Sequence, residues 1–244
     1  MPEVVIFSDV HLSEGDPSGA GRLMSFLQEV GARAGRIYIL GDFFDFWFGP
    51  AQGRWRPFKD ALQALSDLCA SGVEVVYYHG NRDFYMDEKT AGSYGFRVVR
   101  DYSIENICGQ RVLLCHGDML CTNDISYHRA RRVFRHPATE RFARALPPFV
   151  ARSLAKIYRF HSKRSVPAKA RWVIGIEKDA VLRHFALGAD TIICGHTHRE
   201  GTVEFDTPEG RRELHTLGDF GREGSYIECG PSGMVFRRYE PPGA

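Results

Sequence analysis

The first half of the chain alternates short apolar runs with longer amphipathic ones. Three apolar runs have the length of strands, namely Val4–Phe7, Ile37–Leu40 and Val73–Tyr78. Between them, apolar residues recur at steps of three and four, which is the spacing of one helix face. These residues are Leu23, Phe26, Leu27 and Val30 in the first interval and Phe58, Leu62, Leu65 and Leu68 in the second. Strands that alternate with helices favour parallel pairing through right-handed crossovers, so the pattern predicts an α/β fold.

The second half adds two more strand-sized runs and a C-terminal tail in which apolar and polar residues alternate over shorter distances. The runs are Arg111–Cys115 and Thr191–Cys194. The tail, Thr202–Arg238, alternates in short runs that are broken near Pro208 and Pro231, each followed two residues later by glycine. Such breaks are turn signals, so we expect antiparallel hairpins added to the α/β core.

Residues 124–186, between these parts, are predicted to be helical. Apolar residues again recur at steps of three and four, with interruptions at Pro137 and Pro147-Pro148. They are Val133, Phe134, Phe142, Leu146, Phe149, Val150, Leu154, Ile157 and Tyr158. We interpret this segment as a helical insertion within a single domain that spans residues 1–244.

Charge is distributed unevenly along the chain. The formal net charge is only +2, but the stretch from His128 to Arg171 holds thirteen Lys or Arg residues and a single acid, Glu140. The rest of the chain is therefore acidic. This asymmetry predicts that the insertion meets an anionic partner.

Composition bounds the setting in which the chain works. Hydrophobic residues make up 43% and charged residues 25% of 244 positions, as in an ordinary globular protein. No apolar run is long enough to span a bilayer, and the N-terminus lacks the basic region of a signal peptide. We therefore expect a mature, cytoplasmic chain. The six cysteines form no CxxC pair, so we expect buried thiols and neither disulfides nor a cysteine zinc site.

Each of five predicted strands ends in residues that can bind a metal. The five endings are Ser8-Asp9-Val10-His11, Gly41-Asp42-Phe43-Phe44-Asp45, His79-Gly80-Asn81-Arg82-Asp83, His116-Gly117-Asp118 and Gly195-His196-Thr197-His198. Open α/β sheets bind ligands at the carboxyl ends of their strands. Residues two apart on an extended segment point the same way, so Asp9 can act with His11. Carboxylates, an amide and imidazoles together suit Mn²⁺, Fe²⁺ or Zn²⁺, whereas an all-oxygen set would indicate Mg²⁺ or Ca²⁺.

In this order the five motifs resemble those of the calcineurin-like metallophosphoesterase family, over nearly the whole chain. The resemblance implies a β-sandwich flanked by helices and a site for two divalent metal ions. Carried over by motif, one ion would be bound by Asp9, His11 and His198, the other by Asn81, His116 and His196, and Asp42 would bridge the two. The resemblance also gives Asp42, Asn81 and His116 catalytic roles.

Two cations roughly 3.5–4 Å apart lower the pKa of a shared water and clamp an in-line displacement at phosphorus. The metals then absorb the charge that develops on the phosphoryl oxygens. We expect Asp45 and Asp83 to orient the ligand histidines from behind. For His79 two interpretations are open: it could orient a ligand histidine in the same way, or it could be a histidine with a purely structural role.

Arg82 stands where general members of the family carry a histidine after the motif asparagine. A guanidinium cannot donate a proton near neutral pH, but its planar fork matches phosphate oxygens. Arg82 therefore favours a substrate with a second phosphate or a good leaving group.

Three longer stretches, Leu40–Gly49, His79–Phe84 and Leu113–Asp124, resemble the subfamily that hydrolyses UDP-2,3-diacylglucosamine in lipid A biosynthesis. The resemblance implies cleavage of the pyrophosphate to UMP and 2,3-diacylglucosamine 1-phosphate (lipid X), with manganese as the metal. It also implies a peripheral position on the inner face of the inner membrane and a lid over the acyl chains, made by residues 124–186. The implied substrate-binding residues are Asn81, Arg82, Asp124, Ser162 and Lys169.

The basic insertion is physically compatible with this role. A cationic, amphipathic helical segment can hold a diphosphate and dock on an anionic leaflet. Its apolar stripe has two open interpretations, an acyl groove or a face that packs on the core.

The sequence motifs are also compatible with other functions. A related phosphodiesterase for another diphosphate lipid, a cyclic nucleotide or nucleic acid would use the same motifs, and a basic stretch can follow a nucleic-acid backbone. No recognisable nucleic-acid module is present, so nucleic acid is not the expected partner. A metal-free scaffold is disfavoured because all seven ligand positions are filled.

Overall fold

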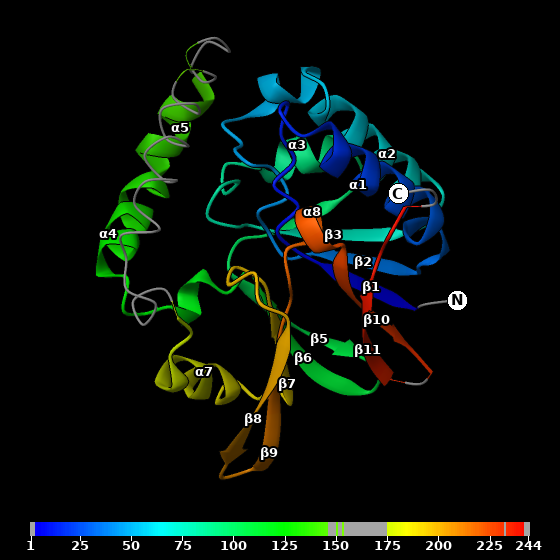
Figure 1. The fold of residues 1–244 in the computed structure, drawn as a ribbon. Coiled ribbons are helices and arrows are strands. Elements are labelled where there is room, and N and C mark those ends of the chain that lie inside the picture. The colour runs from blue at the N-terminus through cyan, green and yellow to red at the C-terminus, as the bar shows by residue number, and fades with distance from the viewer. Residues whose placement is uncertain (1–2, 146–149, 151–152, 154–174, 232, 242–244) are drawn as a thin grey trace.

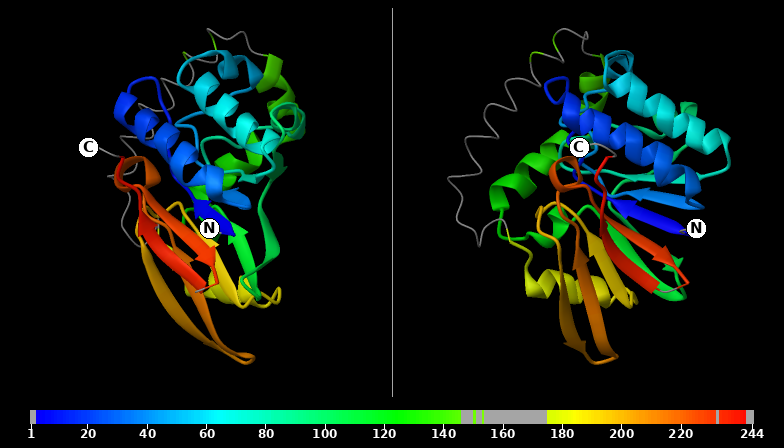
Figure 2. Two further views of the ribbon diagram at one scale, coloured as in Figure 1. Left: turned by 90° about the vertical axis from the view of Figure 1, so that its right-hand side faces the viewer. Right: turned by 45° about the vertical axis from the view of Figure 1, so that its right-hand side comes forward.

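A computed structural model describes residues 3–145, 150, 153, 175–231 and 233–241 (Figure 1). Two β-sheets pack face to face, and helices cover their outer sides, as the family resemblance predicted (Figures 1 and 2). The first sheet has the order β11-β10-β1-β2-β3-β4. Its strands are β1 (Val4–Phe7), β2 (Arg36–Ile39), β3 (Glu74–Tyr78), β4 (Arg97–Val99), β10 (Ser225–Gly230) and β11 (Gly233–Arg238).

The second sheet has the order β5-β6-β7-β9-β8. Its strands are β5 (Tyr102–Ile107), β6 (Gln110–Cys115), β7 (Thr191–Cys194), β8 (Gly201–Thr207) and β9 (Gly210–Thr216). The described helices are α1 (Pro17–Glu29), α2 (Phe58–Ala70), α3 (Glu88–Ser93), α4 (Ile125–Phe134), α5 (Pro137–Ala145), α7 (Lys178–Phe185) and α8 (Phe220–Glu223). Short 3-10 turns lie at Gly31–Arg33, Pro50–Arg54 and Asp118–Leu120.

The strand pairings confirm the α/β prediction for the first half of the chain. Strands β1, β2, β3 and β4 pair in parallel, and α1 and α2 connect the first three. The tail forms the two predicted hairpins, β8–β9 and β10–β11, but they enter different sheets. Strand β10 pairs antiparallel with β1, whereas β9 pairs in parallel with β7. Turn signals locate a hairpin, but they do not select the sheet edge that it joins.

The central strands β1, β2 and β3 of the first sheet are buried on both faces, which explains their apolar runs. Val5 and Phe7 pack with the helices α1 and α2, while Val4 and Ile6 face the second sheet. A third cluster forms where α7 covers the outer face of the second sheet. Parallel pairing places the carboxyl ends of β1, β2 and β3 at one edge, and the ends of β6 and β7 meet them there.

Helices α4 and α5 form the first part of the predicted insertion and stand beside that edge (Figures 1 and 2). Helix α7 also falls within residues 124–186, but it packs on the second sheet. Most of the predicted apolar stripe from Leu146 onward, together with Ser162 and Lys169, lies outside the described residues. In the described part of the chain, no helix is both long enough and apolar enough to cross a membrane.

Candidate metal centre

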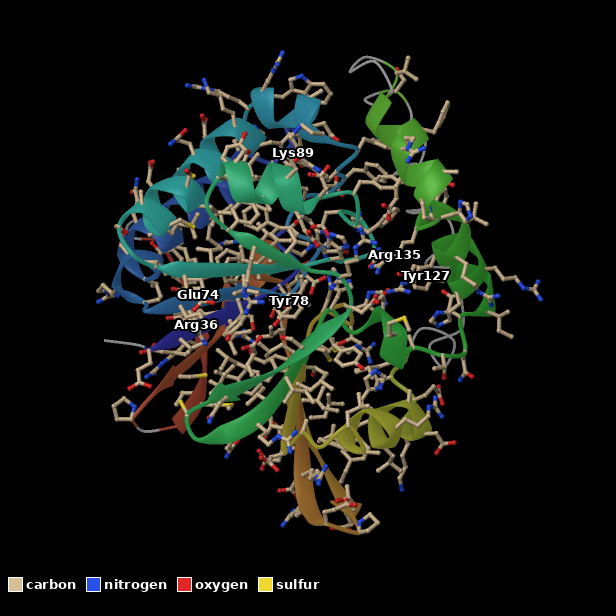
Figure 3. All side chains as sticks on the ribbon, turned by 180° about the vertical axis from the view of Figure 1, so that it is seen from behind. Arg36, Glu74, Tyr78, Lys89, Tyr127 and Arg135 are labelled. Carbon is tan, nitrogen blue, oxygen red and sulfur yellow. The ribbon has the colours of Figure 1, made fainter. Side chains whose placement is uncertain are left out.

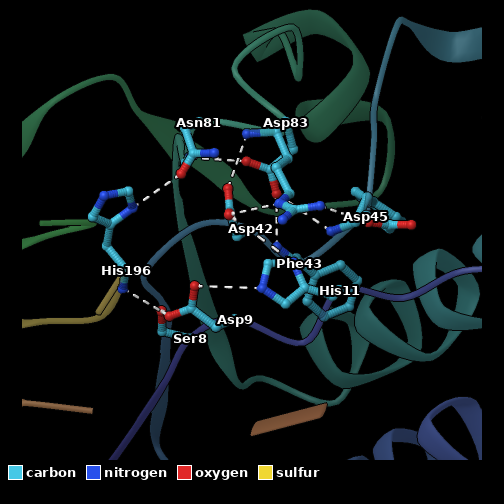
Figure 4. Close-up of polar contacts among 12 residues, drawn as sticks. Ser8, Asp9, His11, Asp42, Phe43, Asp45, Asn81, Asp83 and His196 are labelled. Atoms are coloured by element: carbon cyan, nitrogen blue, oxygen red, sulfur yellow. Dashed lines mark hydrogen bonds and ion pairs between the residues drawn. The ribbon is translucent and has the colours of Figure 1, made fainter. Parts of the chain in front are cut away.

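The loops after five strands bring all seven predicted ligands together. Figure 4 shows Asp9, His11, Asp42, Asn81 and His196 among them. One ligand atom from each of Asp9, His11 and His198 lies within 4.8 Å of the others. His11 Nε2 and His198 Nε2 are 3.3 Å apart, and Asp9 Oδ1 is 3.3 Å from His198 Nε2. These three residues therefore form the first of two ligand clusters.

The second cluster consists of Asn81, His116 and His196. Asn81 Oδ1 lies 3.0 Å from both His116 Nε2 and His196 Nδ1, and those two nitrogens are 3.2 Å apart. Asp42 joins the clusters, since its Oδ1 is 3.7 Å from His116 Nε2 and its Oδ2 is 4.0 Å from His11 Nδ1. The family resemblance implies a bridging role for Asp42, and that role stays a prediction.

Unusual backbone conformations accompany this convergence. Six non-glycine residues in the described chain have positive φ, and five of them are predicted ligands. Their φ angles are 58° for Asp9, 51° for His11, 50° for Asp42, 68° for His196 and 55° for His198. Each such conformation costs about 1–3 kcal/mol and persists only where the surroundings enforce it, which is typical of functional sites.

Two glycines allow the loops to approach this closely. A Cβ atom on Gly80 would overlap the Asp42 side chain, and one on Gly195 would overlap Ser8 and Asp9. Because these two positions carry no Cβ atom, the neighbouring amides can reach the carboxylates. The His196 amide donates to Asp9 Oδ2 at 2.9 Å, and the Arg82 amide donates to Asp42 Oδ1 at 2.9 Å. Both carboxylates are thus fixed by backbone amides of the opposite loops.

The second ring nitrogens of two histidines fix how the imidazoles present their lone pairs. His116 Nδ1 donates to the Leu40 carbonyl oxygen at 2.8 Å, because a carbonyl can only accept. His198 Nδ1 lies 2.9 Å from Asp219 Oδ2 and donates to it in the same way. In the neutral imidazoles, each Nε2 is then left with a lone pair that faces the clusters, as in metal-bound histidines generally.

The donor set fits divalent cations. Asp9 Oδ1 and His11 Nδ1 are buried and make no hydrogen bond with the described residues, which is costly for polar atoms. Burial raises the pKa of Asp42 to about 7, with the neighbouring carboxylates of Asp83 and Asp9 adding to the rise. Burial alone would lower the pKa of His116, but Asp42 and Asp9 raise it to about 9. The site therefore gathers buried carboxyl and imidazole groups at close range, and a bound cation would favour the ionised form of the carboxyls.

The three predicted supporting residues have defined partners in the structure. Asp83 was expected to orient a histidine, but it accepts from the amides of Phe43 at 2.7 Å and Gly80 at 2.8 Å, and from Tyr77. It thus ties the loop after β2 to the loop after β3. Asp45 accepts from Arg82 Nη1 at 2.8 Å. His79 Nε2 lies 2.6 Å from the carbonyl oxygen of Met86, which supports the structural reading of this histidine.

The predicted substrate-side residues also have defined places. Arg82 Nε lies 3.4 Å from Asp42 Oδ2, and the Arg82 side chain keeps 23% of its surface exposed. Asp124 is buried and caps α4 by accepting from the Tyr127 amide at 3.0 Å. A direct role of Asp124 toward substrate stays a prediction.

Asp219 is a functional residue that sequence reasoning missed. It follows β9 in the segment Leu217–Phe220, which repeats the letters Leu-Gly-Asp-Phe of Leu40–Phe43. Its Oδ1 caps α8 through the Arg222 amide at 3.0 Å, while its Oδ2 holds His198. The repeated tetrapeptide was a signal that could have identified it.

Replacing Asp219 with asparagine is expected to weaken binding of the first metal about 10–100-fold, the usual effect of losing the partner of a ligand histidine. Metal titration followed by calorimetry would measure this loss. Asp206→Asn, an exposed carboxylate on β8, is the matched control. Unchanged metal affinity in Asp219→Asn would show that His198 needs no such support.

Two adjoining clusters of carboxylate, amide and imidazole groups, joined by one aspartate at the edge of a two-sheet sandwich, define the class of dinuclear metal-dependent hydrolases. The family model of the calcineurin-like phosphoesterases matches residues 2–200, and the chain belongs to that family. Dinuclear metal sites are the common feature of these enzymes.

Curated relatives extend over the full length of the chain. The UDP-2,3-diacylglucosamine hydrolase of Azotobacter vinelandii is 36% identical and covers 94% of this chain and 95% of its own. The hydrolases of the same name from Actinobacillus succinogenes and Stutzerimonas stutzeri are 32% and 34% identical, respectively. They cover 98% and 94% of this chain, and 100% and 96% of their own chains.

Proposed function

We propose that this chain hydrolyses UDP-2,3-diacylglucosamine to UMP and 2,3-diacylglucosamine 1-phosphate (lipid X). Water attacks one phosphorus of the pyrophosphate, a P–O bond to the water oxygen forms, and the bridging P–O bond breaks. The observation that carries the proposal is the pair of ligand clusters joined by Asp42. The full-length relatives named for this activity support the choice of substrate.

The residues of the centre have distinct roles in this proposal. Asp9, His11 and His198 would hold one cation, Asn81, His116 and His196 would hold the other, and Asp42 would contribute to both sites. When bound, the two cations activate water and neutralise charge on the phosphoryl oxygens. Mn²⁺ is the proposed metal, because the mixed oxygen and nitrogen donors suit a borderline divalent ion.

Asn81, His116 and Arg82 line the same edge and face the proposed position of the diphosphate. Arg82 is permanently charged and is held between Asp42 and Asp45, with part of its surface exposed. We propose that it binds the phosphate that is not attacked.

Arg82→Ala should lower kcat/KM for a diphosphate substrate about 100-fold, since a charge-assisted contact to phosphate contributes roughly 1.5–3 kcal/mol. Hydrolysis of a simple phosphodiester such as bis(p-nitrophenyl) phosphate should fall far less. Steady-state kinetics on both substrates measures the difference, with the exposed Arg54→Ala as the control. Equal losses on the two substrates would contradict the assigned role.

Residues 124–186 are proposed as a helical lid within the single domain 1–244, with Asp124, Ser162 and Lys169 on the substrate side. Helices α4 and α5 expose large apolar residues, with 62% of Ile125, 63% of Val133 and 67% of Phe142 exposed. Arg129 and Arg132 are exposed on α4 among them. A face of this kind suits an anionic lipid surface, so we propose peripheral association with the cytoplasmic face of the inner membrane.

Phosphorus NMR of the purified, Mn²⁺-loaded protein with UDP-2,3-diacylglucosamine tests the proposal, with the metal removed before spectra are recorded. UMP and lipid X as the products would support it. Turnover of simple phosphodiesters without turnover of this substrate would reject the substrate and keep the metal centre. A parallel reaction of Asp42→Ala controls for contaminating hydrolases.

A further inference from the structure

Asp118 is the last residue of the His116-Gly117-Asp118 motif, and its carboxylate forms hydrogen bonds with the predicted insertion. The side chain is 3% exposed. Asp118 Oδ2 accepts a hydrogen bond from the Tyr127 hydroxyl and a second, at 3.2 Å, from Arg131 Nε. Both donors lie on α4, so a buried acid beside a ligand histidine is bound by the first helix of the insertion.

A second carboxylate extends this connection. Arg131 Nη2 lies 2.5 Å from Asp101 Oδ1, and Arg135 Nη1 lies 2.8 Å from the same oxygen. Arg135 also donates to the carbonyl oxygen of Arg100 at 3.1 Å. The guanidinium of Arg131 thus spans two acids of the core, a geometry that the shorter point charge of lysine cannot reproduce.

Aromatic contacts bring α4 to the remaining ligand loops. Phe134 stacks on Phe84, with ring centroids 6.2 Å apart, and the Arg135 guanidinium lies 5.8 Å from the centre of the Phe84 ring. Phe84 follows the ligand Asn81 by three residues. The Tyr127 ring lies 6.5 Å from the ring of His196. Tyr127 and Arg135 extend from α4 toward the core (Figure 3).

Among the described residues, helix α4 is held mainly by polar and aromatic side-chain contacts, and His128 Nε2 adds one more at 3.0 Å from the Cys121 carbonyl oxygen. It is ten residues long, and none of its described side chains is fully buried. Isolated helices shorter than about 12–15 residues are marginal in water, so a helix of this length depends on tertiary contacts. Its contacts with Asp118 and Asp101 are mainly polar and charge-assisted, which makes its position sensitive to single side chains.

We propose that Asp118, Tyr127 and Arg131 form a clasp that fixes α4 over the metal centre and sets how tightly the acylated substrate is held. Asp118 is then a positioning residue that acts through α4. The clasp is inferred from contacts between residues of this protein and does not depend on the identity of the substrate. Its effect on the acylated substrate rests on the proposed function.

Hydrogen exchange of the full-length, metal-loaded protein tests the clasp without any substrate. Amides of α4 should exchange about tenfold or more faster in Arg131→Met, because the substitution removes charge-assisted hydrogen bonds that fix the helix. Tyr127→Phe should give a smaller increase. Arg132→Met, an exposed neighbour on the same helix, should match the wild type. Arg131→Lys can contact only one of the two acids and should fall between Arg131→Met and the wild type.

Kinetics then tests the consequence for substrate. In Arg131→Met, KM for UDP-2,3-diacylglucosamine should rise about tenfold, while kcat on bis(p-nitrophenyl) phosphate stays within about twofold and two metals remain bound. Equal exchange of α4 in Arg131→Met and Arg132→Met would overturn the clasp. Faster exchange with an unchanged KM would overturn its role in substrate binding. If the wild type does not hydrolyse this substrate, the proposed function is wrong. The hydrogen-exchange experiment still shows whether the clasp fixes α4.

Discussion

Replacing Asp42 with alanine is expected to remove both metal ions and to lower kcat/KM by about 10⁴-fold or more, a large share of the acceleration that enzymes provide. Asp42 approaches both ligand clusters, with carboxylate oxygens 3.7 Å from His116 Nε2 and 4.0 Å from His11 Nδ1. Without it, each cluster keeps three ligands but loses the shared carboxylate. The two sites then no longer bind as a pair.

Metal analysis of the dialysed protein and steady-state kinetics on a simple phosphodiester measure this result together. Asp42→Asn provides the matched comparison, since it keeps the shape and an oxygen donor but removes the charge. We expect it to retain part of the metal and to lose most of the activity. Wild-type turnover in Asp42→Ala would defeat the two-metal interpretation of the site.

The strands that carry the site could be predicted from sequence because two simple rules apply to them. Val4–Phe7 is an unbroken apolar run, Thr191–Cys194 is apolar after its first residue, and both are strands with these bounds. The carboxyl ends of parallel strands share an edge, so the residues after them were expected to converge. The meeting of the two sheets did not follow from these rules and came from the family resemblance.

Other strands were missed because they lack an apolar run. Strand β4 is three residues long and begins with Arg97, and β5 alternates partly exposed residues on the outer edge of the second sheet. Such edge strands are held by neighbouring backbone and carry little pattern of their own. The register of the tail hairpins was unpredictable for the same reason.

Ligands were easier to predict than the residues that support them. A strand end restricts where a ligand such as Asp9 can point, whereas a supporting carboxylate can bond to any nearby donor. Asp83 bonds to backbone amides, and Asp219 reaches His198 from the connection between β9 and α8, which showed no histidine or asparagine motif. The contact of Asp118 with Arg131 depends on tertiary packing of the insertion, which local spacing does not encode.

Replacing His116 with alanine is expected to lower kcat by about 10³-fold or more without unfolding the chain. Losing an outer partner of a ligand histidine typically costs 10–100-fold, and losing the ligand itself must cost more. The fold should survive because His116 sits at a loop where several residues hold strained backbone, and strained functional sites tend to trade stability for activity.

Thermal unfolding, metal analysis and kinetics on the same preparation separate these effects. His184→Ala on α7 is a suitable control, because this partly buried histidine bonds to the Ala180 carbonyl of its own helix. It should bind two metals and retain full activity. In His116→Ala, metal loss should be confined to the cluster with Asn81 and His196, because the first cluster keeps Asp9, His11 and His198. Loss of both metals would instead mean that the clusters bind only as a unit, whereas wild-type kcat would exclude His116 from the centre.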